Sequence, residues 1–115
     1  MELVTIEEGA VVSVAIKGRL DSVGADMLKA RMSQLIESGS TRLVIDFGQV
    51  AYISSAGFRV LLVASRLAEQ AKGALALSGI SGEMRRLFDL AALTEMFTIL
   101  PDRAQAVEAL AKRDS

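Results

Sequence analysis

Two short segments near the N-terminus carry hydrophobic residues in the alternating pattern of β-strands. In the segment 11–17, Val12, Val14 and Ile16 lie two residues apart, which places them on one face of a strand. A shorter segment, 4–8, precedes it, and a glycine-containing turn joins the two. The pattern therefore predicts a β-hairpin at the start of the chain.

Helical spacing replaces this alternation after the second strand. We expect residues 18–21 to interrupt the strand pattern, since glycine and aspartate there favour a turn. Asp21 or Ser22 would then cap a helix that ends near Gly39. The apolar residues at helical spacing in this segment are Ala25, Leu28, Met32, Leu35 and Ile36.

Strands and helices alternate through the rest of the chain. Leu43–Phe47 is a nearly continuous apolar run, typical of a central strand covered on both faces, and we expect a loop over 48–54 after it. The further elements expected are a helix over about 55–72, a strand over 74–77, a helix over 82–90 with Met84 and Phe88 toward the sheet, a strand over 97–100, and a helix opened by Pro101 and Asp102 with Val107 and Leu110 inward. This order predicts an α/β fold, a mixed four- to five-stranded sheet flanked by about four helices.

Composition narrows the possible functions. With 115 residues, 51% of them hydrophobic, and a single proline, the chain fits one domain over 1–115. It has no cysteine, which excludes a thiolate nucleophile and a cysteine-built metal site, and no histidine, which is the commonest general base and metal ligand. We therefore predict no catalytic residue, no metal site and no cofactor. The formal net charge of −1 does not indicate a nucleic-acid-binding protein, which would carry clustered lysines and arginines.

The sequence shows neither the features of a signal peptide nor those of a membrane-spanning segment. Residues 1–8 carry three acids and no basic region, unlike a signal peptide. The longest uncharged apolar run, Val60–Ala64, is far shorter than the roughly 20 residues of a membrane span. We expect a cytoplasmic protein that does not insert into a membrane.

The segment that follows the central strand carries two adjacent serines where a helix begins. Ser54 or Ser55 could simply cap this helix by accepting an orphan backbone N–H. Alternatively, one of them is a phosphorylation site, because a helix N-terminus tolerates added negative charge. Gly57 has no side chain, which would let the active site of another protein approach the hydroxyl.

The same segment resembles the signature of the STAS domain (sulfate transporter and anti-sigma factor antagonist), in particular that of the stand-alone bacterial anti-sigma factor antagonists. The signature is an apolar strand ending in Asp-Leu, a short loop, Ile-Asp-Ser-Ser/Thr-Gly-Leu and an apolar helix. Here Asp46-Phe47 ends the strand and Ile53–Phe58 follows at the matching spacing. Further similar stretches are Gly18-Arg19-Leu20-Asp21, Gly73–Leu77 and Ile80–Leu93, so the resemblance covers almost the whole chain.

The resemblance implies a phosphorylation switch with an assigned acceptor. In the family, an anti-sigma factor that is an ATP-dependent serine kinase phosphorylates the serine matching Ser55. This chain departs from the family where Ser54 replaces an aspartate and Ala56 replaces a second hydroxyl residue, which leaves Ser54 as a rival acceptor. The partner-binding residues expected from the motif are Asp21, Ser54, Ser55, Ala56, Gly57 and Phe58.

Two alternatives stay open at this point. Asp21 either caps the first helix or takes part in kinase contact, as the matching residue does in the family. The implied function is an anti-sigma factor antagonist that binds the kinase when unphosphorylated, frees the sigma factor for transcription, and is reset by a PP2C-type phosphatase. The alternative function is a structural STAS subunit of a cytoplasmic transporter or of another regulatory complex, which needs no acceptor hydroxyl.

Overall fold

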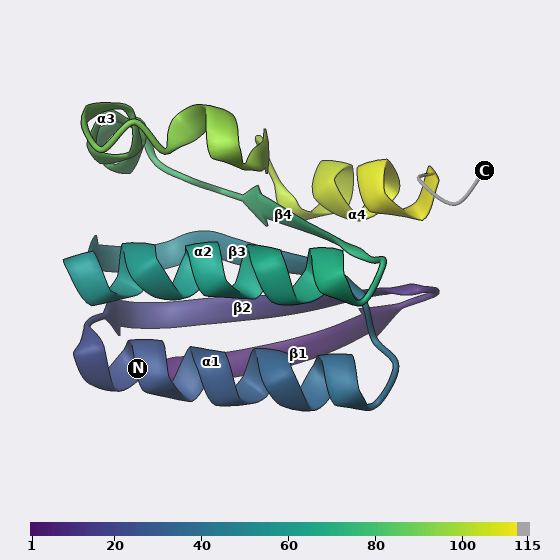
Figure 1. The fold of residues 1–115 in the computed structure, drawn as a ribbon. Helices are drawn as coiled ribbons and strands as arrows, with labels where there is room; N and C mark the ends of the chain where they lie inside the picture. The colour runs from purple at the N-terminus through teal and green to yellow at the C-terminus, as the bar shows by residue number, and fades with distance from the viewer. Residues whose placement is uncertain (113–115) are drawn as a thin grey trace.

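A computed structural model describes residues 1–112 and shows a five-stranded sheet with helices on both faces (Figure 1). The elements in chain order are β1 (Glu2–Glu8), β2 (Val11–Leu20), α1 (Ser22–Glu37), β3 (Arg42–Ile53), α2 (Ser55–Gln70), β4 (Ala74–Ser78), α3 (Gly82–Leu90), a 3-10 turn η1 (Thr94–Met96), β5 (Thr98–Leu100) and α4 (Arg103–Ala111). Among residues 1–112, no helix is both long enough and apolar enough to cross a membrane.

The strands lie in their sequence order, β1-β2-β3-β4-β5. β1 and β2 form the expected antiparallel hairpin, and the other neighbours pair in parallel. Each parallel connection contains a helix, because a parallel crossover needs a dozen or more residues to return to the starting edge. The predicted α/β class with a mixed sheet is confirmed.

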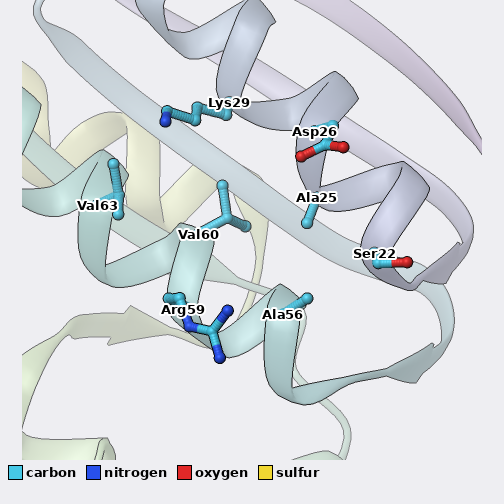
Figure 2. Close-up of a pocket in the computed structure, with 8 residues that line it drawn as sticks. All are labelled: Ser22, Ala25, Asp26, Lys29, Ala56, Arg59, Val60 and Val63. Carbon is cyan, nitrogen blue, oxygen red and sulfur yellow. The ribbon is translucent and has the colours of Figure 1, made fainter.

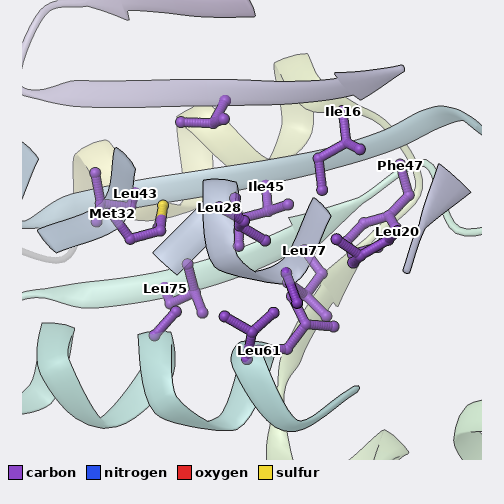
Figure 3. Packing of buried hydrophobic residues seen from close by; sticks show 14 of the residues in the cluster. Ile16, Leu20, Leu28, Met32, Leu43, Ile45, Phe47, Leu61, Leu75 and Leu77 are labelled. Carbon is purple, nitrogen blue, oxygen red and sulfur yellow. The ribbon is translucent and has the colours of Figure 1, made fainter. Parts of the chain in front are cut away.

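The main core lies between the sheet and the pair α1 and α2, which run side by side (Figure 1). Alternate residues of each central strand point into it, as Leu43 and Ile45 of β3 do. The fully or almost fully buried side chains drawn in Figure 3 include Ile16, Leu20, Leu28, Met32, Leu43, Ile45, Phe47, Leu61, Leu75 and Leu77. Burying an aliphatic side chain of this size contributes about 1.5–3 kcal/mol, so this layer supplies much of the driving force for folding.

A smaller core covers the opposite face of the sheet. Val44, between Leu43 and Ile45 in β3, points to this side and packs under Ala106 and Leu110 of α4. Val107 is partly buried against the same cluster, as the sequence predicts. Helices therefore cover both faces of β3, which explains its nearly continuous apolar sequence.

Two sequence predictions about the end of this sheet are wrong. Residues 18–20 continue β2, and residues 48–53, expected as a loop, continue β3. The two extensions pair with each other through two register irregularities, and Gly18 has a φ of +107° beside them. Polar and glycine residues suggested a turn, but the backbone partner supplied by the neighbouring strand outweighs that local preference.

Aromatic contacts hold α3 against the sheet. The ring of Phe88 meets those of Phe47, Phe58 and Phe97 edge-on, with centroids 6.5, 5.0 and 6.0 Å away. Met84 and Phe88 are both buried, which confirms the inward face predicted for this helix. The contact to Phe58 fixes α3 relative to the first turn of α2.

Candidate phosphorylation and partner-binding site

The candidate site is formed where the two longest strands end side by side. Leu20, the last residue of β2, pairs with Ile53, the last residue of β3. One residue further along the chain, Asp21 caps α1 and Ser54 caps α2. Because parallel strands end at the same edge, the N-termini of both helices come together there. The sequence motifs 18–21 and 53–58, more than thirty residues apart, therefore lie at one edge of the sheet.

Ser54 is the N-cap of α2, and its hydroxyl both donates and accepts a hydrogen bond. Its Oγ accepts a hydrogen bond from the backbone N–H of Gly57 at 3.2 Å and donates one to the carbonyl oxygen of Leu20, also at 3.2 Å. The backbone N–H of Ser54 donates to the same carbonyl at 2.9 Å. The half-buried Ser54 side chain thus joins the start of α2 to the end of β2.

Ser55 is the first residue of α2, and its side chain is exposed. Its hydroxyl forms no hydrogen bond with the other residues of the 1–112 segment. The two adjacent serines are therefore chemically different, since one hydroxyl is engaged with the backbone on both sides and the other faces solvent. Of the two alternatives drawn from the sequence, Ser54 satisfies capping and Ser55 is the hydroxyl that a second protein can reach.

Gly57 is needed for a reason other than the one expected from the sequence. It is buried, and a Cβ built on it would lie 2.8 Å from the carbonyl oxygen of Leu20 and 2.8 Å from Cγ1 of Ile53. These separations are well inside van der Waals contact. The missing side chain lets α2 approach the sheet, and it does not open a path for another protein.

The two neighbours of Gly57 are half-buried and differ in what they contact. Phe58 packs against Phe88 of α3, so most of its ring belongs to the interior. Ala56 lines a groove of about 300 Å³ between α1 and α2, together with Arg59 and the α1 residues Asp26 and Lys29 (Figure 2). Of the predicted partner-binding residues, Ser55 is the most exposed.

Asp21 acts as the N-cap of α1. Its carboxylate accepts a hydrogen bond from the backbone N–H of Gly24 at 2.9 Å. This confirms the capping role and excludes Ser22 as the cap, since Ser22 is the first residue of the helix. The half-buried Asp21 follows Leu20 directly and so lies beside the Ser54 cap.

The sequence interpretation missed a surface with exposed apolar residues where the end of β3 meets α3. Tyr52 at the end of β3 and Leu87 and Leu90 of α3 are 42%, 44% and 84% exposed. We refer to these three residues as the Tyr52–Leu90 patch. They line one groove of about 590 Å³, and the guanidinium of Arg19 stacks 4.2 Å above the Tyr52 ring centroid.

A signal for this patch was present in the pattern of α3. Met84 and Phe88 occupy the inward stripe of the helix, and Leu90, two positions after Phe88, falls on the opposite side of the helix. Large apolar residues gathered on a surface mark contact sites more reliably than single ones do. On the α1 side, Val23 and Met27 are also exposed large hydrophobic residues.

Comparison with known proteins places this chain in a family. The chain is 28% identical over 109 residues to the Bordetella bronchiseptica protein BtrV, named as a candidate anti-sigma factor antagonist, with 95% of this chain and 94% of the relative covered. It is 30% identical over 88 residues to the anti-sigma-B factor antagonist of Bacillus subtilis strain 168, covering 76% of this chain and 80% of the relative.

A solved structure gives the same result for the fold. The Bacillus cell fate determinant SpoIIAA in its phosphorylated form superposes with a TM-score of 0.73 at 21% identity, covering 94% of this chain and 98% of that one. The STAS domain family model matches residues 2–106, from β1 into α4. The motif around Ser55, the strand order and this match over nearly the whole chain agree, and the chain belongs to the STAS domain family.

Proposed function

We propose that this protein is an anti-sigma factor antagonist whose binding state is switched by phosphorylation of Ser55. Unphosphorylated, it binds an anti-sigma factor that is a serine kinase and so frees the sigma factor for transcription. The observation that carries the proposal is the difference between the two serines, since the Ser55 hydroxyl is exposed and the Ser54 hydroxyl is held by two backbone groups. The relatives named as anti-sigma factor antagonists support the proposed antagonist role.

The protein supplies a hydroxyl, and the partner supplies the chemistry. Ser55 Oγ attacks the γ-phosphorus of ATP bound to the kinase, the bond to the bridging oxygen breaks, and ADP leaves. The hydroxyl proton passes to a base of the kinase. A PP2C-type phosphatase reverses the modification by hydrolysing the phosphoserine with water, which releases inorganic phosphate. In this scheme the antagonist is a substrate and a binding surface and catalyses nothing itself.

Phosphorylation would prevent binding by adding negative charge to the surface that the partner covers. A phosphoserine adds about −1.5 to −2 charges at neutral pH. Ser55 lies two residues after Ile53, which with Tyr52 lines the groove of the Tyr52–Leu90 patch. Removing that charge from water in the contact with the partner would cost several kcal/mol, and each 1.4 kcal/mol or so weakens binding tenfold.

The decisive experiment combines a cognate anti-sigma kinase, Mg-ATP and site mapping by mass spectrometry. We expect one phosphate, on Ser55, and none in Ser55→Ala, which should still bind the kinase. Ser22→Ala is the matched control, because Ser22 is also the exposed first residue of a helix at the same edge of the sheet. Phosphate on Ser54 or Ser22 instead would refute the assignment of Ser55 as the acceptor. Tight kinase binding of the Ser55-phosphorylated protein would refute the switch and favour a structural STAS subunit.

A further inference from the structure

Arg59 lies one helical turn after Ser55 on the surface of α2. Residues at i and i+4 are neighbours on a helix, with Cβ atoms about 5–6 Å apart. Arg59 is exposed, and Figure 2 shows its guanidinium directed back along α2 toward the first turn. An arginine side chain in this orientation can reach a group attached to the residue four positions earlier.

The positive charge of Arg59 has no acidic partner on its own helix. The positions that neighbour it on the helix surface hold Ser55, Ala56, Leu62 and Val63, and the first turn of α2 contains no acid. Arg59 forms no ion pair with any other residue of 1–112. Of these four neighbours, only Ser55 can acquire a negative charge, and it does so only when phosphorylated.

We infer that Arg59 is the internal counter-ion of phosphorylated Ser55, a positioning residue whose guanidinium donates hydrogen bonds to the phosphoryl oxygens across one turn of α2. This inference rests on the proposed modification of Ser55. The order of charges is the favourable one, since an anion N-terminal to a cation at i, i+4 stabilises a helix more than the reverse. The planar guanidinium also fits phosphate through paired N–H donors.

Such a pairing affects the charge state of the switch. The second pKa of a phosphoserine is ordinarily about 6, so a fraction of the groups carry only one negative charge just below neutral pH. A guanidinium in contact favours the doubly charged form and lowers that pKa. Arg59 would therefore keep the phosphate doubly charged under mildly acidic conditions, and the phosphorylated antagonist would stay dissociated from the kinase.

Other charged groups also lie around the first turn of α2. Asp21 lies at the cap of α1, and Asp26 and Lys29 line the α1 side of the groove that Arg59 also lines. Arg19 is stacked on Tyr52. These groups are the same in every variant below, so differences between variants report the effect of position 59 alone.

The test uses protein in which phosphoserine is incorporated at position 55 during synthesis. The second pKa of the phosphate is read from the phosphorus-31 chemical shift during a pH titration. We expect the wild-type phosphate to titrate at least half a pH unit lower than the phosphate of Arg59→Gln, with Arg59→Lys in between. Arg66→Gln is the matched control: Arg66 is also exposed on α2 but lies eleven positions after Ser55, and its titration should match the wild type.

The outcomes separate this inference from the switch on which it rests. Equal titration in wild type and Arg59→Gln, within about 0.1 pH unit, would overturn the pairing even if kinases phosphorylate Ser55. Conversely, the titration needs no kinase, so a protein that no kinase modifies would refute the proposed function and leave a measured pairing intact.

Discussion

The hydroxyl of Ser54 donates a hydrogen bond to the carbonyl oxygen of Leu20 while it accepts one from the N–H of Gly57. One small side chain thus connects β2 to α2 and caps the helix. The neighbouring Ser55 hydroxyl remains exposed because Ser54 already meets the needs of the backbone. This difference gives the first prediction, which concerns folding stability.

Ser54→Ala should lower the free energy of unfolding by about 1 kcal/mol, the usual cost of removing a serine cap. Ser55→Ala should change it by less than about 0.5 kcal/mol, as expected for an exposed side chain without a partner. Urea unfolding of the two variants measures both values. Equal effects at the two positions would show that Ser54 is not the working cap.

Gly57→Ala should be more damaging than either serine substitution. The new Cβ would lie 2.8 Å from the carbonyl oxygen of Leu20, and backbone cannot move aside as a flexible side chain can. Overpacking of this kind typically costs about 1–3 kcal/mol. Chemical denaturation of the purified variant gives the value.

The control for Gly57→Ala is Gly82→Ala. Gly82 is the first residue of α3, and a Cβ there would meet nothing within 4 Å. Alanine should leave stability unchanged or raise it by up to about 1 kcal/mol, through reduced freedom of the unfolded chain. A stable Gly57→Ala protein would contradict the close approach of α2 to the sheet. Because of the same close contacts, a bulky residue at position 57 would lower folding stability, so its effect on partner binding could not be read separately.

The sequence predicted most of the fold because its apolar periodicities are strong. Spacing predicted β2 and α1, a nearly continuous apolar run predicted β3, and the Met84–Phe88 stripe points inward as expected. The extension of β3 through residues 48–53 was missed because it depends on pairing with β2. Such a partner is visible only in three dimensions.

At the candidate site, the motif located both serines, but it could not decide which one caps α2. That depends on where the carbonyl of Leu20 lies, thirty-four residues earlier in the chain. The role of Gly57 was misjudged for a similar reason. Its environment is made by the ends of β2 and β3, which the sequence around the glycine does not reveal.

Ser55→Asp should separate binding from folding. A negative charge in the first turn of a helix is tolerated, so the free energy of unfolding should stay within about 0.5 kcal/mol of the wild type. Binding to the anti-sigma kinase should weaken at least about tenfold, or 1.4 kcal/mol. Aspartate carries one charge where phosphoserine carries nearly two, so phosphorylation itself should have the larger effect. Isothermal titration calorimetry measures the affinity.

Ala104→Asp provides the control for charge alone. Ala104 is exposed in the first turn of α4, on the face of the sheet opposite α1 and α2. It receives the same single negative charge and should bind the kinase like the wild type. If Ala104→Asp weakened binding as much as Ser55→Asp did, net charge and not the position of Ser55 would govern the interaction.

Leu90→Ser tests whether the Tyr52–Leu90 patch belongs to the partner surface. At 84% exposure, Leu90 contributes little to the core, so the substitution should change the free energy of unfolding by less than about 0.5 kcal/mol. If the partner buries this side chain, its removal should cost about 1.5–3 kcal/mol of binding, a weakening of roughly ten- to a hundredfold. Ile6→Thr on β1, where Ile6 is 37% exposed and lies outside the groove, should leave the affinity unchanged. Phe88→Ala, by contrast, should unfold the protein more readily, by about 3–5 kcal/mol, because Phe88 is fully buried among three other phenylalanines. Wild-type affinity in Leu90→Ser would show that the kinase does not bury this side chain and would contradict a partner surface that includes the Tyr52–Leu90 patch.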